Sequence, residues 1–444
     1  MSGFQSPRGL RDIREPEASA FAWAEEHAWS AALAAGYARI QLPVAEDSAL
    51  FERAIGGTSD VVAKELYRLA VRSEESTPLA LRPEVPAGVV RAYLQHGMRS
   101  EPQPVRLVTV AELFRHDRPQ KGRYRQFTQF DIEAIGDAGP GIDIEVIELG
   151  TSYLQSVGLR DIQVHLNSVG CRTCRPGYLA VLAKHFAAVA DRLSAVDQAR
   201  LEENPLRLLD SKDDVTGAHA KGAPRFVEHL CADCAEHDRA VREGLSIVGV
   251  TVVDAPHLVR GLDYYTKTAW EYLLPGDQGQ QGALGGGGRY DGLVELLGGP
   301  ATPGVGFAIG IDRVILALQE RGLAPAPQRP PAVVVCGIEP GSVGMRIAIA
   351  SELRAAGVSA RADVSSRKIG KQLESAVRDK AIAVIIVEPD GDLSLRDLAA
   401  GSQAEPGARR SGSRGKSRWA SRSEEHTSEL QSHHDLVCRL LLEK

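Results

Sequence analysis

A chain of 444 residues exceeds the length at which one hydrophobic core usually stops growing, so we expect two or three domains. The formal net charge is -6, so a nucleic-acid partner would have to contact local basic patches. The sequence has neither an apolar signal segment nor a run of about 18 apolar residues, so neither secretion nor a membrane span is expected. Six cysteines in so long a chain do not indicate a disulfide scaffold, which favours a reducing, cytoplasmic location.

Two patterns organise the first third of the chain. Residues 15–35 carry small and apolar side chains at helical spacing, which predicts a helix, and a short strand ending at Pro43 follows. Residues 104–115 are rich in branched side chains, 116–124 are rich in turn formers, and 125–135 alternate with period two, which predicts a β-hairpin with a basic tip. On the returning strand we expect a core face and a polar face: Thr128, Phe130, Ile132 and Ala134 on the first, and Arg125, Phe127, Gln129, Asp131 and Glu133 on the second.

A proline-rich linker, residues 324–331, divides the rest of the chain. Before it we expect one catalytic domain, residues 1–325, with a largely helical insertion at about 161–249. After it, alternating strand and helix patterns predict a small α/β domain at residues 332–404. The remaining expected elements are strands within 250–272, a glycine cluster at 285–288, a strand at 304–310 leading into a helix at 311–321, strands at 333–336 and 383–387, and helices at 341–356 and 367–380.

The periodic pattern stops after about Ala404, so the small domain is expected to be truncated. Residues 405–444 are predicted to be a disordered or artefactual tail. Within this tail, residues 409–422 carry basic but no acidic side chains among Ser and Gly. Residues 422–433 read like the in-frame translation of a sequencing-library adapter, which predicts that the gene model runs off a contig.

The segment Leu258-Val-Arg-Gly-Leu-Asp-Tyr-Tyr-Thr266 concentrates the chemistry of a ligand site. Its arginine offers a rigid fork for a phosphate or a carboxylate, and its phenols can hydrogen-bond to a ring nitrogen or stack on a ring. A surface strand with ordinary aromatic residues is the alternative for this segment taken alone.

Five segments, in order, resemble the class II aminoacyl-tRNA synthetases and, within them, the histidyl-tRNA synthetase family. The resemblance implies an α/β protein with an α+β catalytic core on an antiparallel sheet, a helical insertion and a small C-terminal α/β anticodon-binding domain. It also implies a homodimer, with the first motif at the interface. The match runs from about Arg8 to Ala400; the class motifs are the helix and strand ending at Pro43, Phe114–Phe127 and Gly304–Arg313, and the histidine-specific signatures are Leu258–Tyr265 and Gly286–Gly292.

The resemblance implies an enzyme that activates L-histidine with ATP and Mg2+ and transfers it to the 3' end of tRNA(His). Activation brings two anions together, so the site must supply fixed positive charge. Arg115 would bridge the substrate carboxylate and the α-phosphate, Arg260 would stabilise the α-phosphate in the transition state, and Arg313 would hold the terminal phosphates. Arg115 and Arg260 are the candidate catalytic residues. Phe127 would stack on adenine, and the hairpin tip would contact tRNA through Arg118, Lys121 and Arg123.

Recognition of histidine requires an acceptor for its ring N–H and a partner for its other ring nitrogen. By the resemblance, Glu133 and Tyr265 take these roles beside Tyr264, and Gln129 and Glu84 receive the α-ammonium. A solvated pair on one strand face is the alternative for Gln129 and Glu133 taken alone. The full implied histidine-binding set is Glu84, Val85, Pro86, Arg115, Gln129, Glu133, Arg260, Tyr264 and Tyr265.

The chain departs from the family pattern at Arg82-Pro-Glu-Val-Pro86, where the family usually has Arg-Pro-Glu-Gly-Thr. The missing hydroxyl, and the missing N–H of Pro86, predict histidine binding weaker by about 0.5–1.5 kcal/mol rather than inactivity. Asp117 and Asp312 stand where glutamate is usual, which changes contacts to the ATP amino group or to magnesium but keeps each carboxylate.

Two further motifs bear on other possible ligands, a zinc ion and a nucleotide phosphate. Cys171-x-x-Cys174 and Cys231-x-x-Cys234 have the spacing of a four-thiolate zinc site, but the gap between the pairs is long, and no metal ligand is assigned from the sequence. The run Gly285–Gly288 is not a Walker loop, because no Gly-Lys-Ser/Thr follows, and it is expected to allow close backbone packing around the ligand.

The competing function is that of a non-catalytic relative, the synthetase-like regulatory subunit of ATP phosphoribosyltransferase in histidine biosynthesis. That relative generally lacks the C-terminal domain and has degraded arginine signatures. Because Arg115, Arg260 and Arg313 are all present and the small domain is recognisable, the sequence favours the enzyme.

Overall fold

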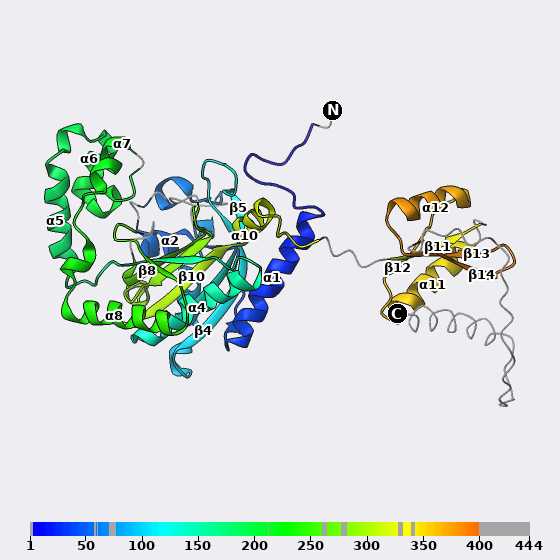
Figure 1. The fold of residues 1–444 in the computed structure, drawn as a ribbon, viewed down its shortest axis with the longest axis horizontal. Helices are drawn as coiled ribbons and strands as arrows, with labels where there is room; N and C mark the ends of the chain where they lie inside the picture. The colour runs from blue at the N-terminus through cyan, green and yellow to red at the C-terminus, as the bar shows by residue number, and fades with distance from the viewer. Residues whose placement is uncertain are drawn as a thin grey trace. The chain divides into compact units, whose positions relative to one another are not determined.

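The computed structural model describes residues 3–56, 59, 61–70, 77–211, 213–259, 264–276, 282–326, 332–338 and 342–398. The chain divides into two compact units, Met1–Pro327 and Gln328–Lys444 (Figure 1). None of the described helices is both long and apolar enough to cross a membrane.

The first unit is built on an eight-stranded sheet in the order β1-β4-β5-β10-β9-β8-β6-β7, which is antiparallel except at its two edge pairs. The antiparallel core expected from the sequence is therefore confirmed. The strands of this sheet are β1 (Ala38–Arg39), β4 (Val105–Phe114), β5 (Gln126–Ile135), β6 (Gln163–Ser168), β7 (Val252–Asp254), β8 (Thr266–Leu273), β9 (Gly285–Arg289) and β10 (Gly304–Gly310), and a separate pair is β2 (Ala45–Asp47) and β3 (Leu79–Leu81). The helices of the unit are α1 (Glu17–Ala34), α2 (Ser48–Ile55), η1 (Val61–Glu65), α3 (Pro86–Gln95), η2 (Met98–Ser100), α4 (Pro140–Ser156), α5 (Arg175–Ala187), η3 (Ala190–Arg192), α6 (Ala195–Glu203), η4 (Pro205–Leu208), α7 (Asp214–Ala220), η5 (Phe226–His229), α8 (Ala232–Ile247), α9 (Leu293–Leu296) and α10 (Ile311–Glu320).

The hairpin of β4 and β5 forms as the period-two pattern predicts, and its two faces have different surroundings. Phe130, Ile132 and Ala134 belong to a large hydrophobic core to which α1, α4 and α10 also contribute. Figure 1 shows these helices gathered beside the sheet. Because successive side chains of a strand alternate, Gln129 and Glu133 point to the opposite face, where the cavity described below opens.

The glycine cluster forms β9, a central strand between β8 and β10. Its lack of side chains lets bulky residues lie against the backbone: a Cβ on Gly288 would be 2.4 Å from Cδ1 of Tyr265. Gly306 on β10 serves Glu133 in the same way, because a Cβ there would be 2.0 Å from its Oε2. Glycine at these two positions therefore makes room for two candidate binding residues.

A buried ion pair joins β9 to the helices behind it. The side chains of Arg289 and Asp143 are both fully buried, and the Arg289 guanidinium also donates to the carbonyls of Asp137 (2.8 Å) and Gly139 (2.9 Å). His237 of α8 lies 3.3 Å from the same carboxylate, measured from Nε2 to Oδ1. This arrangement satisfies a buried guanidinium on several sides and fixes the end of β9 against α4.

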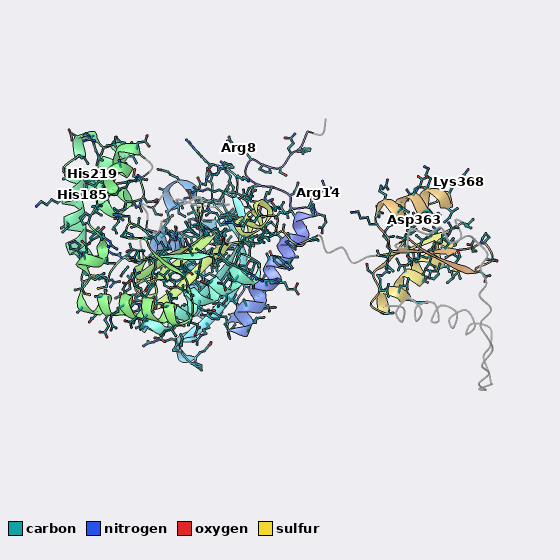
Figure 2. All side chains as sticks on the ribbon, in the orientation of Figure 1. Arg8, Arg14, His185, His219, Asp363 and Lys368 are labelled. Carbon is teal, nitrogen blue, oxygen red and sulfur yellow. The ribbon has the colours of Figure 1, made fainter. Side chains whose placement is uncertain are left out.

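The segment that packs separately from the main sheet is shorter than the insertion expected at residues 161–249. Strand β6 pairs with β7 and β8 in the main sheet, and α8 contributes Val241 and Leu245 to the main core. The elements between β6 and α8 form a small hydrophobic cluster of their own. Within it, the rings of His185 and His219 stack at 4.2 Å and join α5 to α7 (Figure 2).

The second unit is a small α/β domain, as expected. Its sheet has the order β12-β11-β13-β14, with β14 antiparallel to its neighbour. Two hydrophobic clusters, one including Ile349 and the other Ala376, receive alternate residues of β11 and β13, so α11 and α12 cover opposite faces. The bounds are β11 (Val333–Gly337), α11 (Val343–Ala355), β12 (Ala360–Ala362), α12 (Ile369–Arg378), β13 (Ala383–Val387) and β14 (Leu393–Asp397).

Candidate active site

A cavity of about 610 Å3 opens on the side of the sheet to which Gln129 and Glu133 point, and it extends to the first turn of α10. It collects residues from β5, β9, β10, the loop before α3 and the hairpin tip. The sequence-predicted site residues that line it are Glu84, Pro86, Arg115, Arg123, Phe127, Gln129, Glu133, Tyr264, Tyr265 and Arg313. Arg260 lies outside the described residues.

Arg82 anchors the loop that carries Glu84 to the neighbouring backbone. The Arg82 guanidinium donates to the carbonyl oxygens of Leu42 and Glu112, at 2.8 Å in each case. Glu84 itself is buried, and it accepts hydrogen bonds from the Ala87 amide (3.2 Å) and the Tyr264 hydroxyl (2.8 Å). Burial raises the pKa of the Glu84 carboxyl, and the Tyr264 hydrogen bond and the Arg115 charge act in the opposite direction.

The departure at Val85-Pro86 has a local explanation. Pro86 is the first residue of α3, a position where a missing N–H leaves no intrahelical bond unmade. Val85 does not line the cavity, in contrast to its predicted place in the histidine-binding set, because its fully buried side chain belongs to the hydrophobic cluster under α3. Glu84 and Pro86 are the residues of this loop that face the cavity.

Two deeply buried acidic residues of β5 line the cavity. Asp131 and Glu133 are each 1% exposed. Glu133 accepts a short hydrogen bond from the Tyr290 hydroxyl. Neither carboxylate oxygen of Asp131 has a hydrogen-bond partner among the residues that the structure describes.

Burial raises the pKa of both of these carboxyls well above the usual range. At Asp131 the Glu84 carboxylate adds to this effect, while Arg82 and Arg115 oppose it. The positive charges near these carboxyls therefore offset the cost of their burial only in part.

Sequence reasoning missed two residues here, Asp131 and Tyr290. The alternation along β5 already put Asp131 on one face with Gln129 and Glu133, and that shared face was the available signal. Tyr290 stood in a recognised signature, but its hydrogen bond joins residues 157 positions apart, which no local pattern reveals.

The other end of the cavity is cationic. Arg115 donates from Nε to the Pro83 carbonyl (2.8 Å), and its guanidinium carbon lies 5.5 Å from the centre of the Phe127 ring. Within the described part of the chain, neither terminal nitrogen of Arg115 forms a hydrogen bond, so both can bind a ligand. Arg313, in the first turn of α10, donates to the Ala283 carbonyl (2.6 Å) and lines the same cavity.

Asp312 is engaged within the protein. One carboxylate oxygen accepts from the Arg11 guanidinium and the other from the Thr128 amide, each at 2.9 Å. Burial raises the pKa of the Asp312 carboxyl, and these two donors act against that effect. The shorter side chain therefore joins the N-terminal segment and β5 to the start of α10.

The basic residues of the hairpin tip have different surroundings. Arg118 is exposed, and Lys121 forms an ion pair with Glu320 (2.5 Å). Arg123 lines the cavity and forms a close ion pair with Asp117. Of the three predicted tRNA contacts, only Arg123 therefore lies at the cavity wall.

Comparisons with known proteins agree with this geometry. A sequence profile described as histidyl-tRNA synthetase matches residues 9–314. A histidine–tRNA ligase of Dehalococcoides mccartyi is 42% identical over 84% of this chain and 88% of its own length. The chain belongs to the histidyl-tRNA synthetase family. A histidine–tRNA ligase of Moorella thermoacetica is likewise 42% identical, over 90% of this chain and 95% of its own length.

A solved structure from this family has the same fold. The apo histidyl-tRNA synthetase of S. aureus matches with a TM-score of 0.72 and 30% identity, over 89% of this chain and 98% of that one. The class II fold and the aminoacyl-tRNA ligase class expected from the sequence are both confirmed. A Bacillus halodurans structure titled as an ATP phosphoribosyltransferase regulatory subunit/histidyl-tRNA synthetase matches at 20% identity, which concerns the fold alone.

Proposed function

We propose that this chain is a histidine–tRNA ligase, whose cavity first forms histidyl-adenylate from L-histidine and ATP and then transfers the histidyl group to the 3' end of tRNA(His). The division of one cavity into an acidic and a cationic end carries the proposal. Glu133 pairs in register with Gly306, Gln129 pairs with Gly310, and Arg313 follows on α10. An amino acid held by its ammonium at the acidic end directs its carboxylate toward the arginines that attract ATP.

The acidic end supplies the acceptors that histidine needs. Its ring N–H requires an acceptor, and Glu133 presents a carboxylate that Tyr290 holds in place. Its α-ammonium is received by Glu84, Gln129 and Asp131, of which Asp131 was not expected from the sequence. The remaining residues of the proposed histidine site are Pro86, Arg115, Arg260, Tyr264 and Tyr265.

The cationic end supplies the contacts for ATP. Phe127 stacks on the adenine, Arg115 bridges the substrate carboxylate and the α-phosphate, and Arg313 attracts the terminal phosphates. Arg260 acts on the α-phosphate. Mg2+ usually keeps several waters and substrate phosphates among its ligands, so it enters with ATP. Both oxygens of Asp312 already accept protein hydrogen bonds, which disfavours Asp312 as a magnesium ligand.

The tRNA is proposed to contact both units. Exposed Arg118 and the paired Lys121 and Arg123 lie where the acceptor stem would approach, and phosphates would compete with Glu320 and Asp117 for the last two. The second unit would contact the anticodon. We further propose a homodimer that works in the cytoplasm, on the basis of family membership.

The regulatory-subunit alternative has less support. It requires no ATP-activating arginines, whereas Arg115 and Arg313 both line the cavity. Relatives that carry the ligase name are similar at 42% identity over most of the chain.

Histidine-dependent exchange of pyrophosphate into ATP tests the proposal. Exchange above a blank without histidine is expected. Glu133→Gln should lower kcat/KM for histidine by about 100-fold or more, because the ring N–H loses a charged acceptor. Glu112→Gln is the matched control: Glu112 is exposed on β4 and does not line the cavity, so exchange should be unchanged. No exchange by the unaltered chain would instead favour the regulatory role, and equal exchange by the two variants would refute the role of Glu133.

A further inference from the structure

Four cysteines converge where the inserted elements leave and rejoin the main sheet. Cys171 and Cys174 lie between β6 and α5, and Cys231 and Cys234 begin α8. Cys174 and Cys234 are buried, and the other two are half-buried. The two pairs are 60 residues apart in sequence, so the fold, and not the local chain, brings them together.

The spacing of the sulfur atoms fits one metal ion. Sγ of Cys171 lies 3.8 Å from that of Cys174 and 3.8 Å from that of Cys231, and Sγ of Cys174 lies 3.9 Å from that of Cys234. All four sulfurs lie within 4.8 Å of one another. A tetrahedral ion with Zn–S bonds of about 2.3 Å sets its sulfurs about 3.8 Å apart, whereas a disulfide bond is about 2.05 Å long.

The backbone around the first pair is arranged for thiolates. The amide of Cys171 points to Sγ of Cys174 (3.2 Å), and the amide of Thr173 points to Sγ of Cys171 (3.4 Å). Gly170 has a φ of +60°, and a Cβ there would be 2.7 Å from Sγ of Cys174, so glycine lets the chain turn tightly over this sulfur. Amide donors stabilise sulfur in its anionic, metal-binding form.

We propose that Cys171, Cys174, Cys231 and Cys234 bind one Zn2+ ion as a tetrathiolate site where the insertion joins the main sheet. Four thiolates this close repel one another unless a cation lies between them. Soft sulfur ligands in a closed tetrahedron select zinc, and a cluster of several irons would hold its sulfur ligands further apart.

The ion would fix the insertion to the catalytic unit. It joins the chain leaving β6 to the chain entering α8, and the cluster beyond it is small. Arg200 and Arg207 of the insertion line the catalytic cavity, so a shift of the insertion would change the wall of the cavity. Binding of such an ion contributes directly to folding free energy.

Metal content of the purified full chain tests the proposal, independently of activity. Mass spectrometry of the metals is expected to find about one zinc ion per chain in the unaltered protein. The double variant Cys231→Ser/Cys234→Ser should lose the ion and unfold at a lower temperature. Cys336→Ala is the matched control, because Cys336 is a buried cysteine of the second unit, and it should retain the zinc.

A second measurement does not depend on the variants folding. Titration of the unaltered protein with a mercurial reagent, in the presence of a zinc-sensitive dye, should release the ion as the four thiols react. Replacement by Co2+ should produce the visible absorption of a tetrahedral thiolate site. The proposal is overturned if the fresh protein lacks zinc and takes none up, or if iron or two disulfides occupy these cysteines.

Discussion

Asp131→Asn should stabilise the fold and weaken histidine binding, and the surroundings of Asp131 give the size of both effects. Asp131 is 1% exposed, and its carboxylate accepts no hydrogen bond within the described part of the chain. Burial, and then the nearby Glu84 carboxylate, raise the pKa of Asp131 well above its usual range. Asparagine has nearly the same shape but no charge, so the substitution isolates the cost of the buried anion.

The direction of the pKa shift of Asp131 determines how the stability of the fold changes with pH. A carboxyl whose pKa is higher in the folded chain than its unfolded value of about 3.9 binds its proton more tightly when folded. Stability is therefore lost as pH rises from about 4 through the raised folded pKa of Asp131. As the pH rises toward 8, ionisation of the unpaired carboxyl costs about 1–3 kcal/mol, so Asp131→Asn should raise the Tm by about 2–6 °C at pH 8. The difference should shrink as the pH is lowered toward 4.

Histidine binding should change in the opposite direction. The ligand ammonium pairs with the carboxylate, and loss of a charged partner costs about 1.5–3 kcal/mol, or roughly 10–100-fold in Kd. The bound ammonium also lowers the pKa of the carboxyl, so binding to the unaltered chain should release a proton and tighten as pH rises. The variant should release fewer protons.

Calorimetry measures the Tm, the affinity for histidine and the number of protons released on binding. Thermal scans without ligand at pH 5 and pH 8 give the stability change, and histidine titrations in two buffers of different ionisation enthalpy give the proton count. Asp161→Asn is the control, because Asp161 is exposed and lies outside the cavity. A lower Tm for Asp131→Asn at pH 8, with unchanged histidine affinity, would mean that the carboxylate is a structural anchor, and the reasoning would fail.

Three further substitutions test separate parts of the site. Tyr264→Phe removes the hydroxyl that holds Glu84, so KM for histidine should rise about 5–10-fold with little change in kcat in steady-state exchange assays. Arg313→Ala should raise KM for ATP and leave KM for histidine unchanged, and an effect on both would contradict its place at the ATP end. Arg289→Ala leaves the buried Asp143 with His237 but without its guanidinium partner, so urea denaturation should report a loss of about 3–5 kcal/mol, and an unchanged midpoint would disprove the structural role of the pair.

The sequence predicted best where local periodicity matched the final environment. The expected hairpin segments, 104–115 and 125–135, correspond to β4 and β5, and no strand end differs from the expected one by more than one residue. Strand β9 had no such signal, because a run of glycines has no side-chain alternation, and its identity comes from pairing with β8 and β10. The range expected for the insertion was too wide because apolar residues of α8 face the main core, which its sequence pattern does not reveal.

The candidate residues were found more readily than their contacts. Motif resemblance named Glu84 and Glu133, but their partners Tyr264 and Tyr290 lie 180 and 157 positions away. Burial of the acidic face of β5 depends on these distant contacts, so alternation alone could not show that Asp131 is sealed from water. Val85 was placed in the site by its motif neighbours, but its side chain, just before the start of α3, packs in the core instead.

The protein's own cations compensate the acidic residues of the cavity only in part, and this bears on specificity. Burial raises the pKa of Glu84, Asp131 and Glu133. The Glu84 carboxylate adds to this effect at the other two, and Asp131 adds to it at Glu133. Arg115 opposes the effect at Glu84 and Asp131. A ligand with one ammonium and one neutral N–H donor relieves that repulsion and satisfies the acceptors, whereas an aliphatic side chain would leave Glu133 buried without a new partner. In the proposed binding mode we therefore expect other amino acids to be rejected by the cost of an unsatisfied carboxylate as much as by the shape of the pocket.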